Sequence, residues 1–232
     1  MRFFLGSHMP GWLDLTTAPL YLSDRRLRDR KTLPVARGPW ALDSGAFTEL
    51  QKYGTWSRGP SPAEYAERVR RYRDRIGGMC WAAPQDWMCE PIVIRGGMVG
   101  RVRFIGTKLT VAEHQRRTVA NFLSLRSVAP DVPFIPVLQG QTRGDYLMCV
   151  HRYHDAGVDL SMEPVVGIGS VCRRQATGES AGIIASVCQA VPGNGRPRLQ
   201  GLWRSTGASP TGIAPRYRGR RGPSLSAVRG AR

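Results

Sequence analysis

Short apolar runs alternate with amphipathic segments along the first 190 residues, and this alternation restricts the fold more than any other feature of the chain. Five runs have the length and residue content of strands, namely 2–5, 39–43, 79–83, 133–138 and 158–166. Strands that are separated by helices are typical of βα units around a parallel sheet. The pattern therefore predicts an α/β protein, either a (β/α) barrel or an open doubly wound sheet.

Helix signals stand between these runs. Ser61 and Glu64 occupy the two positions of a capping box, at the start of a helix that Gly77 ends. Further helices are expected after the capping pair Thr110 and Glu113, at about 142–156 and at about 176–190. The segment 92–106 predicts a small β-hairpin or an inserted loop. Only about five to six βα units can be counted, so a barrel of this length would be incomplete.

The basic charge is concentrated towards the C-terminus. The formal net charge is +17, no acidic residue follows Glu179, and residues 193–232 contain nine arginines and no lysine. We therefore expect a domain over 1–192 and a basic, irregular tail rich in Arg, Gly and Pro over 193–232. A basic protein attracts polyanions, which indicates nucleic acid as a partner. A GC-rich coding sequence, which encodes arginine readily, is the alternative explanation of the charge.

The remaining composition narrows the class of protein. No apolar run approaches the ~20 residues that a membrane helix needs, so no membrane partner is expected. The five cysteines include no CxxC pair, which favours a reduced, cytoplasmic protein over a disulfide framework. No ligand pair has the spacing of a metal site, and we expect neither a metal nor a cofactor.

Polar residues follow several of the predicted strands. Asp43, Ser44 and Gly45 follow the run 39–43, and Asp86 follows 79–83. Later strand exits carry Gln139, Gly140, Gly167 and Gly169. In barrels and in open α/β sheets, the carboxyl edge of the strands is where sites are built. A shared ligand site at this edge is therefore expected, although an aspartate after a strand also commonly forms an Asx-turn.

The chemistry of these residues suits a flat heterocycle. Asp43 and Asp86 accept hydrogen bonds from N–H groups, and Gln139 both donates and accepts them. A purine fits that inventory better than a phosphorylated sugar does. The segment Gly167–Ser170 (GIGS) offers an alternative, since its amides could hold a phosphate with help from Arg173 and Arg174.

These motifs, in this order, resemble a known family. DSGAF (Asp43 to Phe47) is similar to the DSGGF signature of tRNA-guanine transglycosylases, VLQG (Val137 to Gly140) to their VQG segment, and VVGIGSV (Val165 to Val171) to their glycine-rich strand exit. Over about residues 1–190 the chain resembles the short DpdA-type branch, which comprises deazapurine DNA modification proteins of bacteria and phages.

The resemblance implies a (β/α)8 TIM-type barrel and an exchange of guanine for a 7-deazaguanine base in DNA or, as a second choice, in tRNA. Asp43 would act as the acid/base or base-positioning carboxylate beside the glycosidic bond. Asp86 would read the N–H edge of the purine and Gln139 its carbonyl side, while Gly167 and Gly169 would present backbone groups. Ser44, Gly45 and Gly140 would complete the substrate site, and Arg173 and Arg174 would contact nucleic acid.

Two departures from the family pattern limit these implications. The zinc cysteines of the family have no match, and no acidic residue follows Glu179 to serve as its covalent nucleophile. Back-translation of 198–204 in a shifted frame can encode a family-like Gly-Phe-Gly strand. We therefore expect a truncated or frameshifted member with little activity. Two alternatives remain open: a non-catalytic nucleobase- or nucleic-acid-binding protein, and a TIM-type enzyme that binds a phosphorylated small molecule at the GIGS loop.

Overall fold

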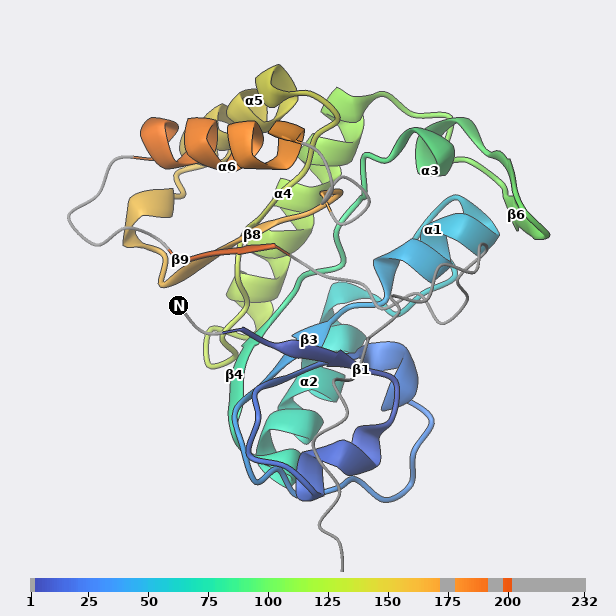
Figure 1. The fold of residues 1–232 in the computed structure, drawn as a ribbon, viewed down its shortest axis with the longest axis vertical. Helices are drawn as coiled ribbons and strands as arrows, with labels where there is room; N and C mark the ends of the chain where they lie inside the picture. Colours follow the sequence, from blue (N-terminus) through green and yellow to red (C-terminus); the bar gives the residue numbers. More distant parts are fainter. Residues whose placement is uncertain (1–2, 172–177, 192–197, 202–232) are drawn as a thin grey trace, which may run out of the picture.

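The computed structural model describes residues 3–171 and 178–191 and the backbone of 198–201 (Figure 1). The parallel strands are β1 (Leu5–Ser7), β2 (Leu20–Ser23), β3 (Trp40–Asp43), β4 (Met79–Ala82), β7 (Val137–Leu138), β8 (Val165–Ile168) and β9 (Arg198–Gly201). The helices are α1 (Ala46–Tyr53), α2 (Pro62–Ile76), α3 (Pro91–Arg95), α4 (Val111–Val128), α5 (Arg143–Asp155) and α6 (Gly178–Ala190). Short 3₁₀ helices occupy η1 (Pro10–Asp14), η2 (Asp24–Arg26) and η3 (Leu160–Met162).

The strands lie side by side in the order in which the chain forms them. One parallel sheet has the order β1-β2-β3-β4 and another the order β7-β8-β9. A single parallel bridge between Ala82 and Phe134 connects the two. The predicted α/β class with a parallel sheet is therefore confirmed. No closed barrel is found within the described part of the chain, where no pairing joins β9 to β1.

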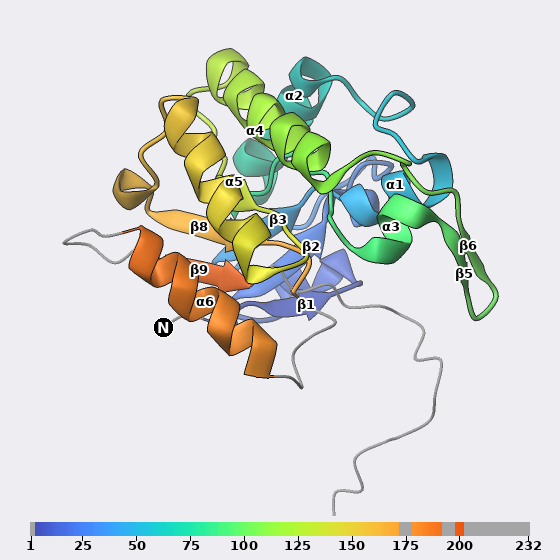
Figure 2. The ribbon, with the colours of Figure 1, turned by 90° about the horizontal axis from the view of Figure 1, so that it is seen from above.

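The helices cover one face of this strand array, as Figure 2 shows for α2, α4, α5 and α6. Along β3, Trp40 and Leu42 belong to the large core beneath these helices, whereas Ala41 belongs to a smaller cluster on the other face. That second cluster consists of Phe4, Tyr21, Ala41, Trp81, Ile135 and Val137. Each buried aliphatic or aromatic side chain contributes roughly 1.5–3 kcal/mol, so both faces of the sheet stabilise its position.

The capping box predicted for α2 is confirmed in full, and the one predicted for α4 is confirmed in part. Ser61 and Glu64 form the complete capping box at the start of α2. The Thr110 side chain accepts a hydrogen bond from the Glu113 N–H at the start of α4, but the Glu113 carboxylate pairs with Arg116 and Arg117. The Tyr65 hydroxyl donates to the Ala83 carbonyl at 2.9 Å, which attaches α2 to the end of β4.

Several strands differ from the expected ranges. The run 2–5 was predicted as the first strand, but β1 begins at Leu5. The run 158–166 contains the η3 turn, because Asp159 accepts a hydrogen bond from the Ser161 N–H, and β8 begins only at Val165. The predicted hairpin in 92–106 is present as β5 (Gly97–Val99) and β6 (Val102–Phe104), preceded by α3.

Two strands were not expected. Strand β2 pairs with both β1 and β3, although its connections to these neighbours contain only the short 3₁₀ helices η1 and η2 and no α-helix. Strand β9 lies inside the segment that was expected to be an irregular tail and pairs with β8. None of the described helices is both long and apolar enough to cross a membrane.

Candidate functional site

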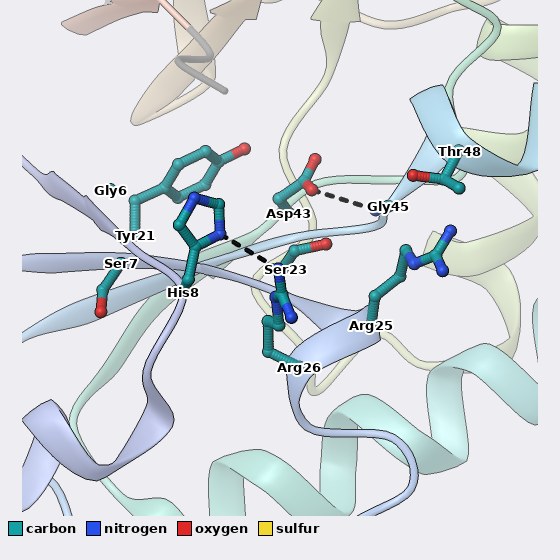
Figure 3. Close-up of a pocket in the computed structure, with 10 residues that line it drawn as sticks. All are labelled: Gly6, Ser7, His8, Tyr21, Ser23, Arg25, Arg26, Asp43, Gly45 and Thr48. Carbon is teal, nitrogen blue, oxygen red and sulfur yellow. Dashed lines mark hydrogen bonds between the residues drawn. The ribbon is translucent and has the colours of Figure 1, made fainter. Parts of the chain in front are cut away.

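A cavity of about 260 Å³ opens at the carboxyl ends of β2 and β3. Ser23 and Asp43, the last residues of the two strands, are register partners and both line it. The lining residues are Gly6, Ser7, His8, Tyr21, Ser23, Arg25, Arg26, Asp43, Gly45 and Thr48 (Figure 3). Its volume is close to the lower end of ligand pockets, ~300 Å³.

Asp43 has two roles in this cavity. The Gly45 N–H donates a hydrogen bond to Asp43 Oδ2 at 3.2 Å, which is the geometry of an Asx-turn. The carboxylate is only partly buried and lines the cavity, between Tyr21 and His8 on one side and Arg25 and Thr48 on the other (Figure 3). The turn and the delivery of Asp43 to a site are therefore compatible, because the turn orients the carboxylate.

Gly45 permits the turn between β3 and α1. Its φ is +79°, in the left-handed region, and a Cβ at this position would lie 2.8 Å from Cγ of Arg25. Any larger residue would therefore be strained and would displace the Arg25 side chain. Gly45 therefore allows the backbone after β3 to lie against Arg25, which follows the neighbouring strand β2.

The basic residues His8, Arg25 and Arg26 line the cavity together with Asp43. Arg26 Nη2 and His8 Nδ1 lie 3.4 Å apart. Arg25 is half-buried and has no hydrogen bond or ion pair to any residue in the described part of the chain. By contrast, Arg28 pairs with Glu49 and Arg68 pairs with Asp24. Arg25 is therefore available to bind an anion from solvent.

Asp86 and Gln139 belong to a buried network beside the cavity. Gln139 Nε2 donates to Asp86 Oδ2, and the Ser170 hydroxyl donates to Gln139 Oε1 at 2.7 Å. The Ser44 hydroxyl lies 3.4 Å from Asp86 Oδ1 and so connects the β3 exit to this network. The Cys89 N–H donates to the Ser170 oxygen at 3.0 Å. The exits of four strands, β3, β4, β7 and β8, thus meet through side-chain hydrogen bonds.

Burial changes the protonation of Asp86. Desolvation, and after it the negative charge of Asp43, raise the pKa of Asp86 to about 7. The Gln139 hydrogen bond lowers this pKa, and the charge of Glu90 raises it further. At neutral pH the Asp86 carboxyl therefore exists in both protonation states, which suits a group that exchanges or shares a proton.

The glycines of the later strand exits are closely packed. A Cβ on Gly169 would lie 2.1 Å from Nε2 of Gln139, and a Cβ on Gly140 would lie 2.8 Å from Cβ of Asp145. The Gly167 N–H donates to the Pro136 carbonyl and the Gly169 N–H to the Leu138 carbonyl. Both amides are therefore used in the hydrogen bonding between β7 and β8. Arg173 and Arg174 lie outside the described residues.

The structure therefore divides the expected site into two connected parts. Asp43 and Gly45 line the open cavity, whereas Ser44, Asp86 and Gln139 meet in the buried network. Sequence reasoning missed Arg25, Arg26 and Thr48 and the buried carboxylate Glu90. The run LYLSDRR (20–26) carried a signal, since an apolar run followed by polar residues is the same pattern that identified Asp43.

The described residues contain no group of three or more His, Cys, Asp or Glu placed to hold a metal ion. Cys80, Cys89, Cys149 and Cys188 are free thiols, and Cys172 lies outside the described residues.

Comparison with known proteins identifies one family. The family model described as DpdA, DeoxyPurine in DNA protein A, matches residues 1–201. The match includes both parts of the site and ends at the last residue of β9. A search of the curated proteins finds no match.

Proposed function

The chain belongs to the DpdA family of deazapurine DNA modification proteins, which is related to tRNA-guanine transglycosylase, and on this premise we propose that it exchanges guanine for a 7-deazaguanine base in DNA. The Asp43 cavity takes the sugar and phosphate of the target nucleotide. The adjoining network of Asp86, Gln139 and Ser44 recognises the base.

The observation that carries the proposal is the presence of opposite charges in one cavity. Asp43 presents a carboxylate, and the Arg25 guanidinium lacks a partner within the described residues. A nucleotide carries complementary groups, because its phosphate is an anion and its base offers N–H donors. Arg25 would bind the phosphate, and Asp43 would lie beside the glycosidic bond.

The exchange needs a balanced movement of protons. When the bond between C1′ and guanine breaks, the departing base takes its bonding electron pair and a proton. The incoming 7-deazaguanine loses a proton as it forms the new bond to C1′. Asp43 in its protonated form would deliver the first proton, and the carboxylate that results would accept the second, so that the enzyme ends in its starting state.

Recognition of the base requires the buried pair to open. Asp86 and Gln139 hydrogen-bond each other in this structure. A purine that replaces this contact would donate N–H groups to Asp86 and accept from the Gln139 amide. The Gln139 Oε1 atom accepts from the Ser170 hydroxyl and the Cys89 N–H and can keep both bonds, so only the Nε2 group would exchange its acceptor, from Asp86 to the purine.

We extend the proposal to the fold. The unreversed strand order and the helices on a single face are typical of a (β/α)8 barrel and not of a doubly wound sheet, whose helices cover both faces. The seven parallel strands would form most of its wall.

A base-binding protein that does not catalyse exchange is the second candidate. Asp43 is the one carboxylate among the described residues that line the cavity, and the chain has no acidic residue after Glu179. The covalent nucleophile of a two-carboxylate mechanism therefore has no assigned residue, and low activity remains a prediction.

Release of radiolabelled guanine decides between these functions. The full chain is incubated with guanine-labelled duplex DNA or tRNA and a 7-deazaguanine base, beside Asp43→Asn and the exposed control Asp14→Asn. Exchange is supported if guanine is released from DNA by the wild type and by Asp14→Asn but not by Asp43→Asn. Binding of the 7-deazaguanine base without release supports the second candidate. Release from tRNA alone, or equal release by both variants, contradicts the proposal.

A further inference from the structure

The hairpin formed by β5 and β6 projects from the body of the protein (Figures 1 and 2). Val99 and Val102 are opposite each other, so only Gly100 and Arg101 form the turn. Gly100 has φ +60° and Arg101 has no positive φ, which is the pattern of a type II′ turn. This tight turn gives the hairpin a narrow tip with Arg101 at its end.

The base of the hairpin is held against the helix that follows the candidate site. Phe104 packs edge-on against Phe47 of α1, with 5.3 Å between the ring centres. Gln51 of α1 donates to the Arg103 carbonyl at 2.9 Å and accepts from the Ile105 N–H at 3.1 Å. Because α1 also supplies Thr48 to the Asp43 cavity, the hairpin has a fixed position relative to that cavity.

Beyond its base the hairpin exposes apolar side chains. Val99 and Val102 share a face with the buried Phe104, but they are 38% and 45% exposed. Met98, on the opposite face beside Arg103, is 60% exposed. A two-stranded ribbon is marginally stable by itself, and uncovered apolar groups at a projecting tip commonly mark a contact surface.

The charge of this region selects the kind of partner. The segment 91–110 contains Arg95, Arg101, Arg103 and Lys108 and no acidic residue. The side chains of Arg101 and Arg103 make no hydrogen bond or ion pair within the described part of the chain. A polyanion that also offers apolar surface complements such a hairpin, and duplex DNA has both phosphates and stacked bases.

We propose that the β5–β6 hairpin inserts into a groove of duplex DNA beside the target nucleotide. Arg101 and Arg103 contact phosphates, and Val99 and Val102 pack against the base step from which the target nucleotide leaves. A two-stranded ribbon fits a DNA groove, and apolar wedges that unstack a step accompany the extrusion of bases. The inference rests on the proposed function for its substrate, DNA, but not on catalysis.

The proposed phosphate contacts of Arg101 and Arg103 are tested by measuring how tightly the full chain binds a fluorescent DNA duplex at several salt concentrations. Arg101→Gln/Arg103→Gln is compared with Arg37→Gln/Arg75→Gln, which removes the same charge from two exposed arginines outside the hairpin and the cavity. We expect the hairpin variant to bind about tenfold more weakly, with a slope of log K against log salt reduced by about two. Equal binding by the two variants overturns the inference.

The proposed packing of Val99 and Val102 against the base step is tested with the double variant Val99→Ser/Val102→Ser, which keeps the charge of the hairpin. Far-UV circular dichroism first confirms that this variant is folded. We expect weaker binding of duplex DNA, a loss of the fluorescence increase of a 2-aminopurine at the target site, and unchanged binding of single-stranded DNA. Unchanged duplex binding together with a shift in sedimentation from oligomer to monomer would assign the hairpin to contacts between copies of this chain and overturn the inference. Failure of Asp43→Asn to alter guanine release would count against the proposed function alone, because these measurements concern binding.

Discussion

Asp43 and Asp86 have the same place in the sequence pattern but different surroundings. Each follows a strand, yet Asp43 lines an open cavity and Asp86 lies in a buried hydrogen-bond network. Burial and the charge of Asp43 raise the pKa of Asp86 to about 7, so Asp86 holds its proton more tightly in the folded state than in the unfolded chain. Burial therefore makes Asp86 a carboxyl that retains its proton in part at neutral pH.

The raised pKa of Asp86 predicts that folding stability falls as pH rises. A carboxyl whose pKa is raised on folding stabilises the protein below its unfolded pKa, 3.8, and that contribution is lost as pH rises through about 7. We expect the unfolding free energy of the wild type to fall by on the order of 2–4 kcal/mol between pH 4 and pH 8, and we expect Asp86→Asn to lack this fall. Urea unfolding of both proteins across this range checks it. Parallel pH profiles for wild type and variant would contradict the assignment.

Gly45 predicts a second effect at the residue scale. Gly45→Ala places a Cβ on a residue at φ +79° and 2.8 Å from Arg25 Cγ. We expect a loss of about 1–2 kcal/mol in unfolding free energy. Gly11→Ala is the control, since no atom lies within 4 Å of its added Cβ and its φ is not positive. If the two variants unfold at the same urea concentration, the turn is not strained by a side chain.

Among the elements, those with local signals were predictable from sequence. Helix α2 begins where Ser61 and Glu64 predicted it, because a capping box acts within one turn. Strand β2 was missed because no α-helix separates it from β1 or β3, and Arg25 and Arg26 of the cavity were missed with it. Strand β9 was missed because its pairing with β8 is made by backbone groups, which composition does not report.

The capping box gives a prediction at the scale of the element. Ser61→Ala removes the acceptor of the Glu64 N–H and the hydroxyl that binds the Glu64 carboxylate, and we expect a loss of about 1 kcal/mol in unfolding free energy. Ser61→Asp should retain most of the stability. Ser57→Ala is the control, since Ser57 is exposed and uses only its N–H in the adjacent turn. Equal destabilisation by Ser57→Ala would show that the cap does not contribute.

At the scale of the whole molecule, the open cavity and the basic hairpin lie next to the same helix. Helix α1 carries Thr48 of the cavity and the Phe47 and Gln51 contacts of the hairpin. Residues 202–232 lie outside both the described structure and the family match, and they add seven arginines and no acidic residue. Sequence alone indicated this charge, but it could not place the hairpin beside the site, since their proximity depends on tertiary packing.

This arrangement predicts that the tail adds affinity for DNA without determining the site. We expect a chain that ends at Gly201 to retain its urea midpoint and its affinity for a 7-deazaguanine base, because Asp43, Asp86 and Gln139 are all retained. Its affinity for any DNA sequence should fall, and the slope of log K against log salt should decrease by about 0.9 for each phosphate that the tail no longer neutralises. Salt titrations of labelled duplex DNA against both chains measure this effect. An unchanged slope would mean that the body of the protein, including Arg101 and Arg103, neutralises the phosphates alone, whereas loss of base binding would show that residues after 201 belong to the site.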